Sequence, residues 1–189
     1  HPDTVLMDGD ENPVTDPNWP DEYVLDPGSS AQRAEILTMI GPIIDGCAAD
    51  GFEAVEIDNL DTWTRFDQID ESDALELTSM YIERAHMAGL AIGQKNAAEI
   101  ASRGAQELGF DFAVAESCFV WQECDLYADA YGDRVLAIEY IDEIDGSVDD
   151  LCASADGAPR TIIRDHNLTT PDSPDYYFAA CPDPGEPPI

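Results

Sequence analysis

The chain has 189 residues, of which 41 are acidic and 8 are basic, so its formal net charge is -33. This charge excludes nucleic acid as a partner, because binding to phosphates requires Lys and Arg that displace counterions, and it disfavours anionic membrane surfaces. No run of about 18 apolar residues is present, which excludes a membrane-spanning helix. At about 150 residues per domain, the length predicts one domain.

The composition of the charged residues indicates where the protein works. Lys95 is the only lysine, and the other seven basic residues are arginines. A surface rich in Asp and nearly free of Lys is typical of secreted or salt-exposed proteins, which stay soluble by self-repulsion; the same field would attract a cationic substrate. The sequence begins at His1 without a signal peptide, so we expect that a leader has been removed or that this is a piece of a longer chain. We expect a secreted or cell-surface monomer.

The five cysteines agree with export. No CxxC pair is present and the three histidines are not spaced as zinc ligands, so we expect no metal site. Two disulfides and one free thiol are more typical of an acidic exported chain. We expect the short loop from Cys118 to Cys124 to be closed, Cys152 to pair with Cys181, and Cys47 to stay free, although four cysteines allow three pairings.

Apolar spacing and capping residues predict the elements in chain order. Residues 1–22 are rich in Pro, Asp and Asn and should form loops, and residues 23–26 a short strand. Ser29 or Ser30 can cap a helix that ends near Ala49. Strands and helices then alternate: strands at 52–58, 90–95, 111–116, 134–140 and 160–164, and helices at 72–88, 97–108, 122–131 and 147–155.

This alternation predicts an α/β fold with a parallel sheet. The strands are nearly continuous apolar runs, as expected when helices cover the sheet. No GxGxxG follows the first strand and no GxxxxGK[ST] is present, which disfavours dinucleotide-binding and P-loop proteins. An open sheet and a (β/α)8 barrel remain as alternatives.

Polar side chains stand at the ends of four successive predicted strands. Loops are often polar without having a function, but in a barrel the strand ends meet at one mouth, where active sites lie. Two carboxyl groups on either side of a glycosidic bond are what glycoside hydrolysis requires. Loop aromatics offer faces for stacking on sugars. The strand-end residues are Asp58, Asn59, Lys95, Asn96, Glu116 and Glu139, and the aromatics are Trp63, Phe119 and Trp121.

Four blocks of sequence carry a resemblance to a known family. They read GFEAVEIDNLDTW (51–63), AHMAGLAIGQKN (85–96), FDFAVAESCFVWQEC (110–124) and VLAIEY (135–140). In order and spacing they are similar to glycoside hydrolase family 114, the endo-α-1,4-polygalactosaminidases with a TIM-barrel fold. The chain departs from the family pattern at Glu53-Ala54, where Asp-Gly is usual, at Gln94, where Leu is usual, and at Ala115, where Asn is usual.

The resemblance implies an endo-acting hydrolase of α-1,4-linked, galactosamine-containing polysaccharide that needs no cofactor. It points to Asp58 and Glu116 as the catalytic pair, and we assign Asp58 as nucleophile and Glu116 as acid/base. The substrate-binding residues that it implies are Asn59, Asp61, Trp63, Lys95, Asn96, Trp121 and Glu139.

The number of strands is small for a closed barrel. Six strands are predicted, whereas a (β/α)8 barrel has eight strands and typically about 250 residues. We therefore expect residues 1–165 to form a TIM-barrel domain that lacks its N-terminal one to three strands. Residues 166–189 should form a Pro-rich tail, packed on the barrel or extending from it.

Two other functions stay open. A non-catalytic polysaccharide-binding barrel would keep the pocket without turnover, and Ala115 and the small number of strands favour it. A calcium-stabilised structural module would use acidic clusters as oxygen ligands. Neither cluster matches an EF-hand loop; they are Asp8-Asp10-Glu11 and Asp142-Glu143-Asp145.

Overall fold

The computed structural model describes residues 2–17, 19–153 and 160–182. These residues form two compact units. The first, here the N-terminal unit, comprises His1–Val55 and Asn59–Ala91, and the second, here the sheet unit, comprises Glu56–Asp58 and Ile92–Ile189. The predicted division at residue 165 stays a prediction.

The N-terminal unit begins with a 3-10 turn, η1 (Pro2–Thr4), and a set of antiparallel bridges. Thr15 pairs with Tyr23 and Val5 with Leu25, and the Val24 amide donates to the carbonyl of Val14 at 3.0 Å. The prediction that residues 23–26 form a strand of the parallel sheet is therefore wrong. Their backbone groups are satisfied locally, by the residues just before them.

Two helices follow, α1 (Ser30–Ala49) and α2 (Glu71–Met87), with the short turn η2 (Thr62–Thr64) between them. Ser29 caps α1, as predicted, by accepting the Gln32 amide at 3.2 Å. The buried side chain of Arg33 joins α1 to α2 through Asp73, at 3.0 Å, and through Glu76. The N-terminal unit also contains a small hydrophobic core. It is made of Leu6, Val24, Phe66, Ile69 and Ala74, and Val14 and Trp63 pack against it.

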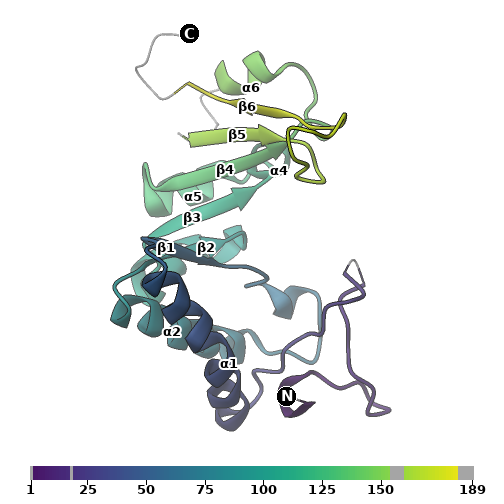
Figure 1. The fold of residues 1–189 in the computed structure, drawn as a ribbon, viewed down its shortest axis with the longest axis vertical. Coiled ribbons are helices and arrows are strands. Elements are labelled where there is room, and N and C mark those ends of the chain that lie inside the picture. The colour runs from purple at the N-terminus through teal and green to yellow at the C-terminus, as the bar shows by residue number, and fades with distance from the viewer. Residues whose placement is uncertain (1, 18, 154–159, 183–189) are drawn as a thin grey trace. The chain divides into compact units, whose positions relative to one another are not determined.

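Across the described residues the sheet has six strands in the order β1-β2-β3-β4-β5-β6 (Figure 1). The pairs from β2 to β5 are parallel, which confirms the α/β prediction, and β6 joins β5 antiparallel. Strand β6 was not predicted, because its three residues carry no period of their own and depend on pairing with β5. The strands are β1 (Ala54–Ile57), β2 (Ala91–Lys95), β3 (Phe112–Glu116), β4 (Val135–Tyr140), β5 (Arg160–Arg164) and β6 (Phe178–Ala180).

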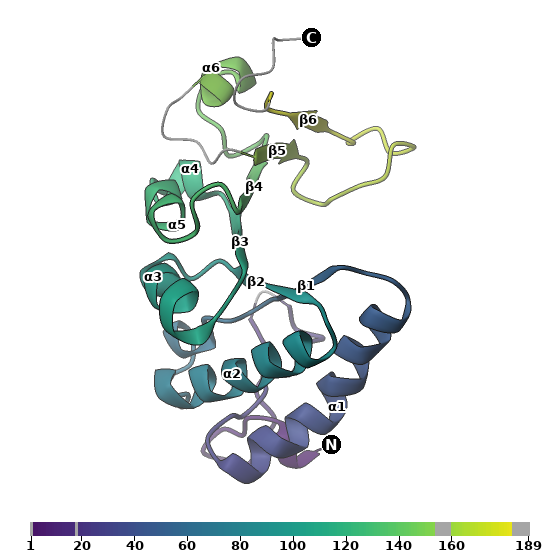
Figure 2. The same ribbon diagram turned by 90° about the vertical axis from the view of Figure 1, so that its left-hand side faces the viewer.

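Helices of the sheet unit line one face of the sheet, as Figure 2 shows for α3, α4 and α5. The continuous helix predicted for 97–108 is instead η3 (Ala98–Ile100), α3 (Ala101–Arg103) and a π turn, η4 (Gly104–Leu108). The reason is packing at Gly104, where a Cβ would lie 2.1 Å from Oε1 of the buried Gln94. The later helices are α4 (Cys118–Trp121), α5 (Cys124–Tyr131) and α6 (Val148–Ala153).

Both predicted disulfides are present. Cys118 pairs with Cys124, and Cys152 with Cys181, while Cys47 is a free thiol. The second disulfide joins α6 to the segment just after β6 and so fixes the end of the sheet. In the ranges that the structure describes, no helix has the length and apolar character needed to cross a membrane.

Candidate active site

Polar side chains from four neighbouring strands meet at one edge of the sheet unit. Lys95 ends β2, Glu116 ends β3 and Tyr140 ends β4, while Asp58 directly follows β1. Parallel strands end at the same edge of a sheet, and this edge is where ligands bind in α/β proteins. The parallel pairing Lys95↔Val114 and Glu116↔Ile138 sets this alignment.

Lys95 lies between two carboxylates. Its Nζ is 3.2 Å from Oδ1 of Asp58 and 3.0 Å from Oε2 of Glu116, and its side chain is only 10% exposed. Loss of hydration alone would lower the pKa of Lys95. The bond to Glu116 and the charges of Asp58, Glu116 and Glu56 outweigh it, so the pKa is raised and the ammonium stays charged.

Asn96 and Tyr140 hold Glu116 with three further hydrogen bonds. Asn96 donates from Nδ2 to Oε2 at 3.2 Å and accepts the Glu116 amide at 2.8 Å. The hydroxyl of Tyr140 donates to Oε1. Partial burial would raise the pKa of Glu116, but the bonds from Tyr140, Lys95 and Asn96 outweigh that cost and lower it. Glu116 is thus kept ionised.

The turns after these strands have left-handed backbones. Asn96 has φ 51° and Ser117 has φ 54°, a region that Asn tolerates better than most residues. Buried Gln94 supports the first turn by donating to the carbonyls of Asn96, at 2.8 Å, and Ala97, at 2.9 Å. Glu143 supports the second by accepting the Ser117 hydroxyl at 2.6 Å.

Glu139 lies apart from this cluster. Neighbouring strand residues point to opposite faces, so Tyr140 reaches Glu116 while Glu139, fully buried, accepts the Phe119 amide at 2.9 Å. Burial raises the pKa of Glu139, with Phe119 and Val120 opposing the shift. Its Oε2 has no hydrogen-bond partner among the described residues.

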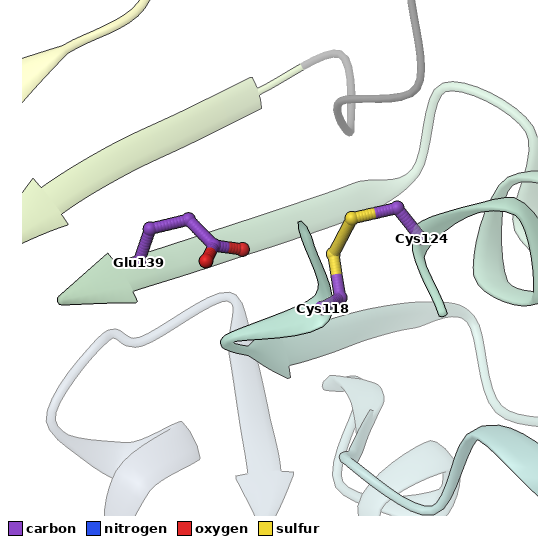
Figure 3. A group of neighbouring side chains, drawn as sticks. All are labelled: Cys118, Cys124 and Glu139. Atoms are coloured by element: carbon purple, nitrogen blue, oxygen red, sulfur yellow. A yellow bond between two sulfur atoms is a disulfide. The ribbon is translucent and has the colours of Figure 1, made fainter. Parts of the chain in front are cut away.

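Figure 3 shows Glu139 beside Cys118 and Cys124. The carboxylate and the two sulfurs lie within 4.8 Å of one another, a spacing that suits metal ligands. Both sulfurs are joined in the disulfide. They therefore cannot act as thiolates, the form of cysteine that binds a metal.

Three predicted substrate-binding residues, Asn59, Asp61 and Trp63, belong to the N-terminal unit. Arg65 holds two of them, because its Nη2 donates to Oδ1 of Asn59 at 2.8 Å and lies 3.7 Å from Oδ1 of Asp61. Trp63 packs against that unit's core. In the sheet unit, Trp121 at the end of α4 is 68% exposed. Asp58, Lys95, Asn96 and Glu116 are the predicted site residues that the structure brings into contact.

Sequence reasoning missed Tyr140 and Glu56. For Glu56 the signal was strand alternation, since it stands two residues before Asp58, whereas the position of Tyr140 depends on the register between β3 and β4. Crowding removes part of the hydration of Glu56 and raises its pKa; Lys95 opposes this, while Asp58 and Glu116 add to it. The site thus contains a third carboxylate and a tyrosine.

Comparisons with known proteins identify the family and the fold. The model of the glycoside-hydrolase family GH114 matches residues 2–185. A search of curated proteins found no match. Two solved structures are similar: Aspergillus fumigatus Ega3 in complex with galactosamine, and the glycoside hydrolase domain of PelA from Pseudomonas aeruginosa.

The two structural matches share the fold at low sequence identity. Ega3 has a TM-score of 0.68 at 22% identity, over 87% of this chain and 66% of that one, so the chain spans slightly less than two thirds of the Ega3 chain. PelA has a TM-score of 0.54 at 16% identity, over 88% of this chain and 70% of that one. With the family match spanning nearly all of the sequence, and these structures confirming the predicted fold class, the chain belongs to glycoside hydrolase family GH114.

Proposed function

We propose that the chain carries the catalytic centre of an endo-acting hydrolase of α-1,4-linked, galactosamine-containing polysaccharide. Family membership supports hydrolysis of a glycoside, and the galactosamine bound by Ega3 suggests the sugar. The observation that carries the proposal is the Lys95 ammonium, shared by Asp58 and Glu116 at neighbouring strand ends. It places two carboxylates together, as glycoside cleavage requires. The disulfides support a secreted or cell-surface location.

The contacts of the two carboxylates favour different roles for them. Glu116 is held ionised by Tyr140, Lys95 and Asn96, which suits a nucleophile. Asp58 is 63% exposed, and in the described part of the chain the structure gives it one ion pair, to Lys95. It is therefore held by fewer groups than Glu116 and is open to solvent, which favours it for the proton transfer. This reverses the assignment that we made from the sequence, in which Asp58 was the nucleophile.

The distance between the carboxylates favours a retaining reaction. The two oxygens that share Lys95 cannot be farther apart than their bridging distances of 3.2 and 3.0 Å combined. This limit, which applies to the nearest oxygens, lies below the range of about 6.5–9.5 Å between the carboxyl groups of inverting enzymes, whereas those of retaining enzymes are about 5 Å apart. In the first step Glu116 bonds to the anomeric carbon while the departing oxygen takes a proton from Asp58. In the second, water gives a proton to Asp58 and displaces Glu116.

Other residues would bind the polymer. We propose that Lys95 and Asn96 donate to sugar hydroxyls and that Asp61 accepts from a sugar ammonium or hydroxyl group. Asn59, Trp63 and Trp121 remain candidates for further contacts. For Glu139 we propose an indirect role, because it holds the Phe119 amide in the turn after Glu116.

Product analysis tests the proposal. The protein, Glu116→Gln and Asp58→Asn would each be incubated with partially deacetylated α-1,4-galactosaminogalactan, and oligosaccharides would be measured by mass spectrometry. We expect products from the parent and a loss of about a thousandfold or more in both variants. The control is Glu107→Gln, which changes a side chain that is 71% exposed on the η4 turn.

Azide can separate the two roles. If Glu116 is the nucleophile, azide should restore turnover of Glu116→Ala with inversion at the new bond, and of Asp58→Ala with retention. The opposite pattern would return the nucleophile to Asp58. A folded parent that binds the polymer without cutting it would instead indicate a polysaccharide-binding barrel.

A further inference from the structure

His166 lies beside Tyr140, one of the residues that bind Glu116, although the proposed chemistry does not use it. It follows β5 by two residues and stacks on the ring of Tyr140, with the ring centroids 4.4 Å apart. Its Nδ1 is 3.6 Å from Oδ2 of Asp142 and 3.7 Å from Oε1 of Glu143. A half-exposed histidine therefore contacts a buried tyrosine and two carboxylates.

Two of these neighbours hold Glu116 directly or through its turn. Tyr140 donates its hydroxyl to Glu116. The other oxygen of Glu143 accepts the hydroxyl of Ser117, the residue after Glu116, at 2.6 Å. His166 therefore contacts both Tyr140, which binds Glu116, and Glu143, which binds the residue after Glu116.

The segment that carries His166 is itself anchored. Oδ1 of Asp165 accepts the Thr169 amide at 2.7 Å, and its Oδ2 accepts the Tyr177 amide at 3.2 Å. The guanidinium of Arg164 donates to the carbonyls of Tyr177 and Thr169. The imidazole is therefore held against Tyr140 by a turn with a fixed backbone.

We propose that His166 is a positioning residue for Glu116, acting through the ring of Tyr140 and the carboxylate of Glu143. The inference rests on the proposed function for the role of Glu116. Burial, the bond to Glu116 and nearby carboxylates raise the pKa of Tyr140, so its hydroxyl keeps the proton that it donates. His166 needs no contact with substrate to act in this way.

The imidazole is held on two sides. Its ring stacks on Tyr140, and its Nδ1 faces the carboxylates of Asp142 and Glu143. The neighbouring Asp165 pairs with Arg164 at 3.5 Å. The stack and the polar contacts at Nδ1 are thus two separate ways in which His166 can hold Tyr140 and Glu143 in place.

Two substitutions separate the stack from the polar contacts at Nδ1. His166→Ala removes both, and we expect kcat to fall about tenfold with KM changed less than twofold, because the change displaces Glu116 and leaves the substrate contacts in place. His166→Phe keeps a ring on Tyr140 but removes Nδ1, so kcat should lie between those of the parent and His166→Ala. His86→Gln, which removes a histidine of α2, serves as the control and should keep the kcat and KM of the parent.

A second readout does not need turnover. The Glu116 carboxyl carbon would be titrated by NMR in the parent, His166→Ala and His86→Gln. We expect the pKa of Glu116 to be higher in His166→Ala than in the other two, since the Tyr140 hydrogen bond is loosened. An unchanged Glu116 titration would overturn the inference, as would an unchanged kcat in a protein that does cleave the polymer. If the parent is inactive, the proposed function fails and the titration alone decides the role of His166.

Discussion

A single hydroxyl at the end of β4 has a large influence on the proposed nucleophile. Tyr140 belongs to the strand next to Glu116 and is the first of the groups that lower the pKa of that carboxyl. A lowered pKa also contributes stability, which is present above the pKa of the unfolded chain and is lost as the pH falls through the folded pKa. Function and acid stability are thus linked at this residue.

Tyr140→Phe removes the hydroxyl and keeps the ring. Without the donor, the pKa of Glu116 rises, so the acid limb of kcat/KM should move to higher pH and the protein should lose stability at a higher pH than the parent. Rates and melting temperatures between pH 3 and 7 check this. Tyr23→Phe, at a tyrosine that is 60% exposed, is the control. An acid limb that stays in place would contradict the role given to Tyr140.

Among the elements, the π turn η4 shows how a buried side chain can override a helical pattern. Gly104 accommodates Gln94, whose amide supports the turn that carries Asn96. Tyr131 of α5 donates to Oε1 of the same Gln94 at 2.7 Å. The irregular helix therefore helps to place Asn96 against Glu116.

Gly104→Ala should disturb this element. A new Cβ would lie 2.1 Å from Oε1 of Gln94 and 2.7 Å from the hydroxyl of Tyr131, so we expect a loss of about 2 kcal/mol in the free energy of unfolding, together with reduced turnover. Gly46→Ala in α1 meets no atom within 4 Å and should stabilise by about 0.5 kcal/mol. Urea unfolding measures both. Equal effects of the two substitutions would show that the Gln94 contact is unimportant.

Local signals predicted some elements well and others poorly. Helix α1 could be predicted from its Ser29 cap, and the end of α2 from Gly89, which has φ 81°. Strand β6 and the bridges near Tyr23 could not, because they depend on pairing partners rather than on their own periodicity. Likewise, strand ends identified Asp58, Lys95 and Glu116, whereas the contact of Tyr140 depends on the register between β3 and β4.

At the scale of the whole molecule, the net charge of -33 should attract a deacetylated, cationic polymer. We expect kcat/KM for cationic oligosaccharides to fall several-fold as salt rises from about 0.02 to 0.5 M, because the field is screened over a few ångströms at the higher concentration. Fully acetylated oligosaccharides are neutral and provide the control. An equal response of both substrates to salt would exclude steering by the charge.

Lys95 carries the only ε-amino group of the chain, and it is bound at the site by Asp58 and Glu116. In most proteins an amine-specific reagent modifies many surface lysines. In this chain the amines that it can modify are Lys95, at the proposed catalytic centre, and the α-amino group. Because the Lys95 side chain is 10% exposed and its pKa is raised, reductive methylation with ¹³C-formaldehyde would be carried out at alkaline pH, and it would place one dimethyl-lysine label beside the two carboxylates. Its NMR signal would follow ligand occupancy directly, without assignment of the remaining spectrum.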